Sequence, residues 1–202
     1  YLAVAVACSA QGVMAAAEPG ENTWWGSEKV KQEKKTTGFI PSVQVRQGYT
    51  DNVYRASKNE KHSWITTVKP GAELKMQKGV NKYTLGANTM AGYYTVDSRN
   101  DYVDWSGYAK AELEFDPRNH LDIGGKHSHK HDPIGTGASE GKAFIQGEPD
   151  EYDQTDGDVK YTFGAKGAKG KLVLRDIYLN KEYTNNRATT DRLDRTDNEV
   201  RA

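Results

Sequence analysis

The segment YVDWSGYAKAELEF, residues 102–115, alternates between two kinds of side chain. Small or apolar residues occupy every second position, and the positions between them carry polar groups, namely Asp104, Ser106, Tyr108, Lys110, Glu112 and Glu114. Successive side chains of a β-strand point to opposite faces of the sheet, so the alternation predicts a strand with one apolar and one polar face. The segment also exceeds the usual strand length of about five or six residues in globular proteins.

The same period of two recurs along most of the chain from residue 39 onward. About seven segments show it, the others being residues 40–50, 63–77, 82–95, 120–131, 158–165 and 171–183. The connections near Gly79, Pro117 and Gly170 are short, and those between them are longer and more polar. Short turns at one end and long loops at the other are typical of transmembrane barrels. We therefore predict an all-β fold, an antiparallel up-and-down transmembrane β-barrel.

The composition agrees with such a protein. Apolar residues make up 36% of the chain and charged residues 28%, which argues against a large compact core. The 28 basic and 28 acidic side chains cancel, so no charge excess points to nucleic acid as a partner. In lipid every backbone polar group needs an internal partner, which strands of a barrel supply to one another. The expected partner is therefore outer-membrane lipid.

The N-terminal region differs from the rest. Residues 1–17 are small and apolar and end in alanines, as in the hydrophobic region and cleavage site of a secretory signal peptide. Because the chain opens with Tyr1 and lacks a basic start, we interpret them as a partial signal peptide. Cys8, the only cysteine, falls inside it, so we expect no disulfide or thiol chemistry in the mature chain. Residues 18–38 form a polar leader.

Residues 39–202 are predicted to be the N-terminal part of an outer-membrane β-barrel. About seven strands are fewer than the eight of the smallest bacterial barrels, and the sequence ends in the polar stretch RTDNEVRA. We therefore expect an incomplete barrel, truncated at its C-terminus as well.

The polar faces of the predicted strands supply the candidate functional residues. In a barrel these faces line the lumen, where they can hydrogen-bond a passing molecule. The lumen-lining candidates are Lys69, Glu73, Lys75, Asp104, Tyr108, Lys110, Glu112, Glu114, Asp122, Lys126 and Arg175. Glu112 and Glu114 share a face and could suit acid–base catalysis, but Lys110 and Tyr108 on that face favour a polar lining.

The segment GGKHSHKHDP holds histidines at every second position, His127, His129 and His131. On an extended strand they share one side, the side predicted to face lipid, with alternate Cα atoms about 7 Å apart. They are weak candidates for a transition-metal site, because three imidazoles in a row usually need a bend to converge on one ion. The alternative is the upper end of a membrane strand at or beyond the interface, where an imidazole exposes its polar tip.

A long loop rich in glycine and acidic residues is expected from about Asp132 to Asp156. Its carboxylates could bind Ca²⁺, but they lack the EF-hand spacing, and a solvated loop is the simpler interpretation. The sequence contains no Gly-rich phosphate loop, nucleophile elbow or HExxH motif. We therefore expect a protein that is not an enzyme and that uses no cofactor.

Three segments carry a family resemblance. In PSVQVRQGYTDNVYRASKNEKHSWITTVKPGAELK, a first strand leads into Tyr49–Asn52, and a second strand ends near Pro70-Gly71. The other segments are HDPIGTG, residues 131–137, and YLNKEYTNN with RLDR, within residues 178–195. Together they resemble a family of outer-membrane β-barrels of Gram-negative bacteria. The motifs are loop and strand-end patterns, so they carry over no catalytic residues.

The resemblance implies a role in the synthesis or export of exopolysaccharide or capsular polysaccharide, at the outer membrane of a Gram-negative bacterium. It also implies a polysaccharide chain and other export components as partners. A second interpretation, which rests on the residues alone, is a secreted or surface β-rich binding protein without catalytic activity, linked to a metal through its histidines.

Overall fold

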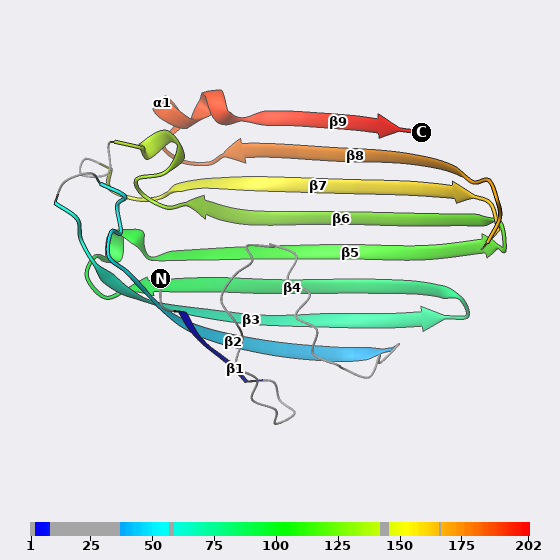
Figure 1. Ribbon diagram of the computed structural model, residues 1–202, viewed down its shortest axis with the longest axis horizontal. Helices are drawn as coiled ribbons and strands as arrows, with labels where there is room; N and C mark the ends of the chain where they lie inside the picture. The colour runs from blue at the N-terminus through cyan, green and yellow to red at the C-terminus, as the bar shows by residue number, and fades with distance from the viewer. Residues whose placement is uncertain (1–2, 9–36, 57–58, 142–145, 166) are drawn as a thin grey trace.

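The computed structural model describes residues 3–8, 37–56, 59–141, 146–165 and 167–202 (Figure 1). They form one sheet of nine strands, which lie side by side in the order of the chain. The strands are β1 (Ala3–Cys8), β2 (Gly38–Thr50), β3 (Ser63–Lys78), β4 (Asn81–Tyr94), β5 (Tyr102–Asp116), β6 (Asn119–Asp132), β7 (Asp150–Phe163), β8 (Leu172–Tyr183) and β9 (Arg195–Arg201). All neighbours are antiparallel, so the predicted all-β, up-and-down topology is confirmed.

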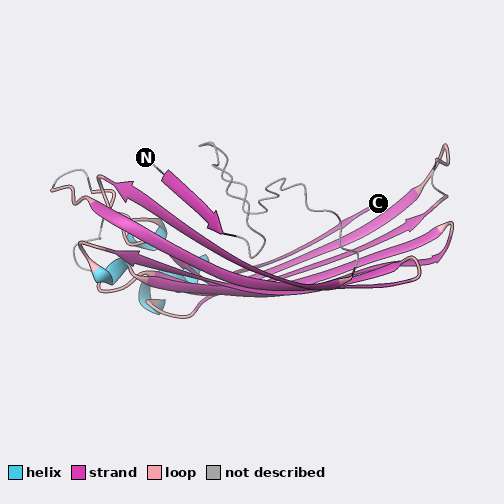
Figure 2. Cartoon of the chain, turned by 90° about the horizontal axis from the view of Figure 1, so that it is seen from below, coloured by secondary structure: helices cyan, strands magenta, loops and turns pink. Residues whose placement is uncertain are grey.

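The sheet is bent into a trough with one concave and one convex face (Figure 2). Its edges are β1 and β9, which do not pair within the described residues, so the sheet is open. Strands β3 to β7 contain 14 to 16 residues. A tilted strand needs about 9–11 residues to cross a bilayer, so these strands are long enough to do so.

The strand count differs from the prediction of about seven, because β1 and β9 were not expected. The sequence of β9, RTDNEVR, has a single apolar residue and hence no alternation to detect, yet it pairs with β8 from Lys181↔Arg195 to Arg175↔Arg201. Strand β1 lies within the predicted signal peptide and pairs with β2. This pairing does not test the signal-peptide prediction. Most of the polar leader lies outside the described residues.

The predicted loop from Asp132 to Asp156 is too long, because β7 begins at Asp150. The sequence misleads here because this part of β7 is polar on both faces. Its backbone is nevertheless paired with β6 as far as Asp132↔Asp150, so only residues 133–149 connect the two strands.

The strand end near Pro70-Gly71 that the family resemblance implied is wrong, whereas the alternation correctly predicted a strand over residues 63–77. Both residues lie within β3, which continues to Lys78. Pro70 has no N–H to donate, and the β3–β4 pairing passes directly from Val68↔Ala91 to Gly71↔Asn88. The proline therefore interrupts the ladder on one side of β3 without ending the strand.

Long loops gather at one end of the sheet and short turns at the other, as predicted (Figure 1). The long loops are residues 51–62, 95–101, 133–149 and 184–194, and the short turns are residues 79–80 and 117–118, with residues 164–171 somewhat longer. The loops contain the short helices η1 (Ser98–Asn100), η2 (Gly137–Ser139), α1 (Arg187–Thr190) and η3 (Asp191–Leu193). Among the described residues, no helix has the length and hydropathy required to span a membrane.

The buried hydrophobic side chains of the described residues are few and lie at the loop end. Val53, Tyr54 and Ile134 form a small cluster between the β2–β3 and β6–β7 loops, and Tyr183 is buried at the end of β8. Many large apolar side chains elsewhere in the sheet are exposed. Since apolar surface of this extent is unfavourable in water, the sheet is suited to an apolar surrounding.

Candidate functional site

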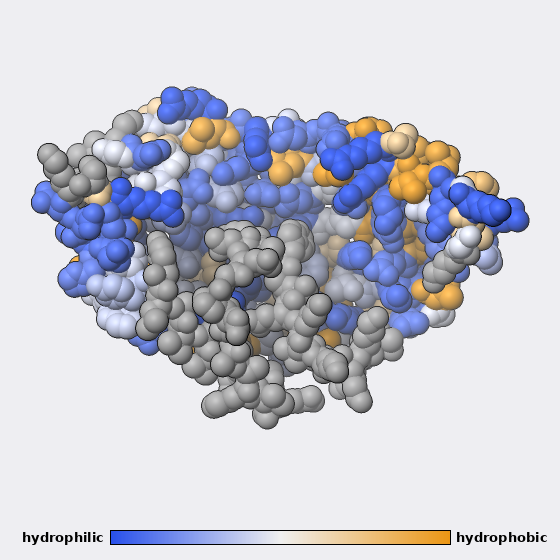
Figure 3. All heavy atoms as spheres, viewed as in Figure 1, coloured by the Kyte–Doolittle hydropathy of each residue, from blue (hydrophilic) through white to orange (hydrophobic). Residues whose placement is uncertain are grey.

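The lumen-lining candidates all lie on the concave face of the sheet. Strand register places them together, because residues paired across an antiparallel sheet point to the same side. One such row is Glu73↔Gly86↔Tyr108↔Lys126 across β3 to β6. The candidates come from β3 (Lys69, Glu73, Lys75), β5 (Asp104, Tyr108, Lys110, Glu112, Glu114), β6 (Asp122, Lys126) and β8 (Arg175). Figure 3 views this face, where hydrophilic residues predominate.

Ion pairs connect many of the charged side chains of this face. Lys75 lies 2.6 Å from Glu73, Lys110 lies 2.7 Å from Glu112, and His120 lies 3.5 Å from Glu114. Between β6 and β8, Lys160 lies 2.7 Å from Asp122 and Arg175 lies 2.6 Å from Asp158. These pairs bring opposite charges together, and the face offers many hydrogen-bond donors and acceptors.

Tyr108 crosses a neighbouring strand to reach its partner. Its hydroxyl donates a 2.6 Å hydrogen bond to Oε2 of Glu73 on β3, although β4 lies between β3 and β5. The ring lies over Gly86, where an added Cβ would come within 2.3 Å of the Tyr108 Cζ atom. Tyr102 covers Gly92 in the same way. The two glycines thus allow tyrosine rings to lie flat on the polar face.

A second aromatic group lies at the loop end of this face. The Lys181 ammonium is 3.5 Å from the centre of the Tyr152 ring and donates a 2.8 Å hydrogen bond to the Tyr183 hydroxyl. Tyr183 in turn donates a 2.6 Å hydrogen bond to Oδ2 of Asp132. Sequence reasoning missed this group because the alternation of β8 is irregular, with Asp176 on its apolar side.

The convex face carries most of the exposed apolar side chains of the described strands. They belong to every strand from β2 to β8: Phe39, Val43, Val45, Trp64, Leu74, Met76, Leu85, Tyr93, Val103, Trp105, Phe115, Ile123, Val159, Phe163, Leu172, Leu174 and Tyr178. The register brings them to one side, through pairs such as Phe39↔Leu74, Leu74↔Leu85 and Ala91↔Val103. This face has the apolar band with flanking aromatics that contacts lipid in a membrane barrel.

The apolar band crosses the strands obliquely. The exposed apolar residue nearest the loop end is Trp64 on β3, Val103 on β5 and Tyr178 on β8. Tyr178 lies farther from the loop end of its strand than the other two do. Above Tyr178 the same side of β8 carries Asn180 and Glu182. A slanted boundary is expected where strands are tilted by about 35–45° to the membrane normal. The loop ends of β6 to β9 therefore project beyond the band.

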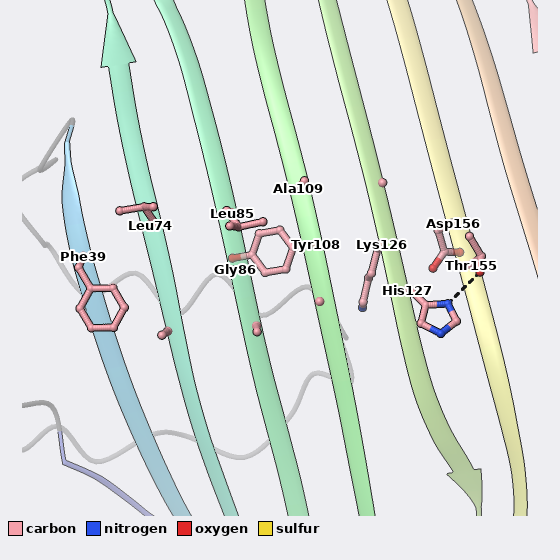
Figure 4. A pocket seen from close by; sticks show the side chains of 14 residues that line it. Phe39, Leu74, Leu85, Gly86, Tyr108, Ala109, Lys126, His127, Thr155 and Asp156 are labelled. Atoms are coloured by element: carbon pink, nitrogen blue, oxygen red, sulfur yellow. Dashed lines mark hydrogen bonds between the residues drawn. The ribbon is translucent and has the colours of Figure 1, made fainter.

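An open hollow of about 800 Å³ lies on the convex face (Figure 4). It exists because small residues meet there on neighbouring strands, including Ala72, Ala87, Gly107, Ala109 and Gly125, while Phe39, Leu74, Leu85 and His127 stand around them.

The three alternate histidines do not converge in the structure. His127 is bonded to the Thr155 hydroxyl at 2.9 Å, and His129 to Asp153 at 2.8 Å. His131 was expected on the same side but is turned to the polar face, where it stacks on Tyr102 and bonds to Asp104 at 2.7 Å. The departure occurs beyond Trp105↔His129, the last pair of the β5–β6 ladder.

No group of three or more His, Cys, Asp or Glu side chains in the described part of the chain has the geometry of a metal site. His127 and His129 lie on β6 beyond Gly125, in the part of the convex face that projects above the apolar band. This placement agrees with the upper end of a membrane strand.

A cluster formed by Tyr54, Asp97 and Arg99 joins three of the long loops. Arg99 donates to Oδ2 of Asp97 at 2.8 Å, to the Tyr54 hydroxyl at 2.6 Å and to the Gln146 carbonyl at 3.4 Å, and Tyr54 donates to Asp97. The bond from Arg99, opposed by burial and aided by Tyr54, holds the pKa of Asp97 well below its usual range. Burial and the bond to Asp97 raise the pKa of Tyr54.

Sequence reasoning missed this cluster, although one signal was present. A Tyr-Thr pair marks the point where a strand passes into the β2–β3, β4–β5 or β8–β9 loop, at Tyr49-Thr50, Tyr94-Thr95 and Tyr183-Thr184. An arginine follows within each loop, at Arg55, Arg99 and Arg187. This repetition marks equivalent loop ends in an up-and-down sheet.

Long up-and-down strands, a polar concave face and an oblique apolar band on the convex face define the wall of a porin-like outer-membrane β-barrel. Residues 38–202 match the family model described as putative beta-barrel porin 2, and the chain belongs to this family. No curated protein and no solved structure matches the chain. Membership of a porin family favours passage across a membrane over catalysis.

Proposed function

We propose that the concave face lines a passage in the outer membrane of a Gram-negative bacterium, and that the protein takes part in the synthesis or export of a capsular polysaccharide or exopolysaccharide. Other export components and a sugar chain are its partners in this proposal. Membership of a β-barrel porin family supports the passage. The chemistry of the concave face supports a polysaccharide as the molecule that passes.

The observation that carries the proposal is the pair of tyrosines that lie over glycines. Tyr108 covers Gly86 and Tyr102 covers Gly92, and the Tyr108 hydroxyl is tied to Glu73. An aromatic ring combines an apolar face with a polar edge, and a sugar ring has the matching apolar faces and hydroxyl edge. Rings lying flat on a polar wall therefore offer a sugar chain stacking surfaces beside hydrogen-bonding groups.

The paired charges support the same ligand class. A wall with charges of one sign attracts or repels ions by their charge. The concave face instead pairs Lys75 with Glu73 and Lys160 with Asp122, which leaves polar atoms with remaining hydrogen-bonding capacity. Such a surface suits a hydroxyl-rich chain.

Conductance of the full-length protein in planar lipid bilayers tests this proposal. We expect long oligosaccharides to block the open current in a concentration-dependent manner. Tyr108→Ala should weaken the block by about tenfold, whereas Tyr108→Phe, which keeps the ring, should weaken it less. Val103→Ala on the convex face is the control and should leave the block unchanged.

Deletion of the gene provides the cellular test. We expect the outer-membrane fraction to contain the protein as a heat-modifiable band, and the deletion strain to lose surface polysaccharide. A soluble periplasmic product would instead favour the second interpretation, a β-rich binding protein. Normal surface polysaccharide in the deletion strain would contradict the polysaccharide role.

A further inference from the structure

Asp150, the first residue of β7, is a buried carboxylate without a counter-charge among the described residues. It is 0% exposed, and its Oδ1 accepts hydrogen bonds from the side-chain amides of Gln146 and Asn186, both at 2.8 Å. Its Oδ2 has no hydrogen-bond partner. Neutral amides do not cancel the charge, and a buried carboxylate is normally paired, protonated or bound to a metal ion.

A second carboxylate faces Asp150 across the sheet. Asp132 is its partner in the last pair of β6 and β7. Opposite residues of an antiparallel pair have Cβ atoms about 4.5–5.5 Å apart. Oδ2 of Asp132 accepts the bond from Tyr183 and lies 3.7 Å from the Lys181 ammonium, so Lys181 balances Asp132. The charge of Asp150 stays unbalanced.

A third oxygen donor lies at the adjacent strand end. Asn100 lies two positions before the first residue of β5 and is 2% exposed, and neither its Oδ1 nor its Nδ2 has a hydrogen-bond partner. The start of β5 lies beside the end of β6, as the stacking of Tyr102 on His131 shows. Two buried side chains with polar atoms that lack a hydrogen-bond partner, Asp150 and Asn100, therefore belong to the strand ends on either side of the end of β6.

We propose that Asp150 and Asp132, which are paired across β6 and β7, bind a divalent cation of the Ca²⁺ type at the base of the β6–β7 loop, with the Asn100 amide oxygen of the neighbouring β4–β5 loop as a further ligand. Ca²⁺ takes carboxylate, amide and carbonyl oxygens in flexible geometry, which is the donor set present here. The cation balances the charge of Asp150, which Lys181 does not reach.

The cation would also hold two long loops together. Asn186 of the β8–β9 loop bonds to Asp150, and Asn185 bonds to the Pro149 carbonyl at 2.9 Å. A cation on Asp150 therefore stabilises the residues on which the β8–β9 loop rests. The site is independent of the polysaccharide role and of an open passage.

Terbium luminescence of the full-length protein in detergent tests the site. Tb³⁺ replaces Ca²⁺ at oxygen sites, and excitation of nearby tyrosines, here Tyr152 and Tyr183, sensitises its emission. We expect sensitised emission that Ca²⁺ displaces stoichiometrically. If the unaltered protein gives no emission that Ca²⁺ displaces, the proposal is wrong and Asp150 is protonated.

Asp150→Asn removes the charge and preserves the shape of the side chain. It should weaken Tb³⁺ and Ca²⁺ binding by more than about tenfold, and Asp132→Asn should weaken binding in the same direction. Asp51→Asn, an exposed carboxylate in the β2–β3 loop, is the matched control and should bind as the unaltered protein does. Equal Ca²⁺ affinity of folded Asp150→Asn and Asp51→Asn variants would overturn the assignment.

A protease assay serves as an independent measurement if Asp150→Asn does not fold. Removal of Ca²⁺ from the unaltered protein with a chelator should speed cleavage within residues 184–194 several-fold, and added Ca²⁺ should reverse the effect. Cleavage at the same rate with and without Ca²⁺ would also count against the proposal.

Discussion

The hydroxyl of Tyr108 on β5 donates a 2.6 Å hydrogen bond to Glu73 on β3, across the glycine of the strand between them. The pair is 35 residues apart in sequence and joins three strands of the concave face. It depends on Gly86, because any side chain at that position would occupy the space of the tyrosine ring.

Gly86→Ala should therefore destabilise the protein by about 1–3 kcal/mol, as expected for an overpacked site. The free energy of unfolding in urea, followed by tryptophan fluorescence in lipid vesicles, measures the effect. Gly124→Ala is the control, since a Cβ there meets nothing within 4 Å, and its cost should be small. In the Gly86→Ala, Tyr108→Ala double variant the clash disappears, so the two effects should not add. Additive effects would contradict the close approach.

The histidines of β6 should differ in their contribution to stability. His131 is enclosed by Tyr102 and Asp104, with 9% of its side chain exposed. His131→Ala should cost about 1–3 kcal/mol, because it leaves the buried Asp104 without this partner. The exposed His127 makes one bond to Thr155, so His127→Ala should cost no more than about 0.5 kcal/mol. Equal costs in urea unfolding would show that His131 does not occupy the polar face.

The Asp97 cluster predicts an acid-sensitive loop. A carboxyl whose pKa is lowered by folding stabilises the folded state above its unfolded pKa of about 3.9, and this stabilisation is lost as the pH falls toward the folded pKa. The β2–β3 loop should therefore resist protease from pH 7 down to about pH 4, and become cleavable only under stronger acid.

Asp97→Asn removes this dependence. We expect the rate of cleavage within residues 51–62 to be raised at every pH, since Tyr54 and Arg99 lose a charged partner. Cleavage rates by pepsin in acid and by trypsin near neutral pH, each normalised to an unstructured peptide, provide the measurement, with Asp51→Asn as the control. If the β2–β3 loop of Asp97→Asn still became more resistant to protease as the pH rises, a group other than Asp97 would control the pH dependence of its cleavage.

Substitution by arginine should destabilise the protein much more at Val45 of β2 than at its neighbour Gln44. Val45 lies on the convex face against Val68, and Gln44 lies on the concave face. Val45→Arg should cost about 2–4 kcal/mol in a bilayer, as for arginine near the midplane of the lipid-facing surface. Gln44→Arg should cost less than about 1 kcal/mol. Urea unfolding in vesicles compares them, and similar costs would be inconsistent with a lipid-facing convex surface.

Much of the fold could be predicted from the sequence because the alternation of polar and apolar residues directly reports the two faces. Lys69, Glu73 and Arg175 were assigned to one face on this pattern, and the register of β3 to β8 places them there. The assignment depends only on the period of a strand and not on which strands are neighbours.

Features that depend on the absence of alternation could not be predicted. The start of β7 is polar on both faces because it projects beyond the apolar band, so it resembled a loop. Strand β9 was missed for the same reason. His131 departs from the pattern because it lies beyond Trp105↔His129, where the β5–β6 ladder ends, and no local residue type signals where a ladder ends.

The side-chain contacts between different strands and between different loops also could not be predicted from the sequence. The Tyr108–Glu73 bond requires the exact β3–β4–β5 register, and the Tyr54–Asp97 contact requires two loops to meet over a distance of 43 residues in the chain. Conformations of loops are set by such tertiary contacts and not by local propensity.

Cysteine scanning of β5 in lipid vesicles tests most directly whether the two faces meet water and lipid. Single cysteines are introduced in a Cys8→Ser background at positions 103–110, and their reaction with a charged, membrane-impermeant thiol reagent is measured. Tyr108→Cys and Lys110→Cys, at accessible positions of the concave face, should react rapidly. Val103→Cys, Trp105→Cys, Gly107→Cys and Ala109→Cys should react slowly, because lipid covers them. Equal reactivity at both sets of positions would contradict a membrane-spanning wall with a water-facing concave side.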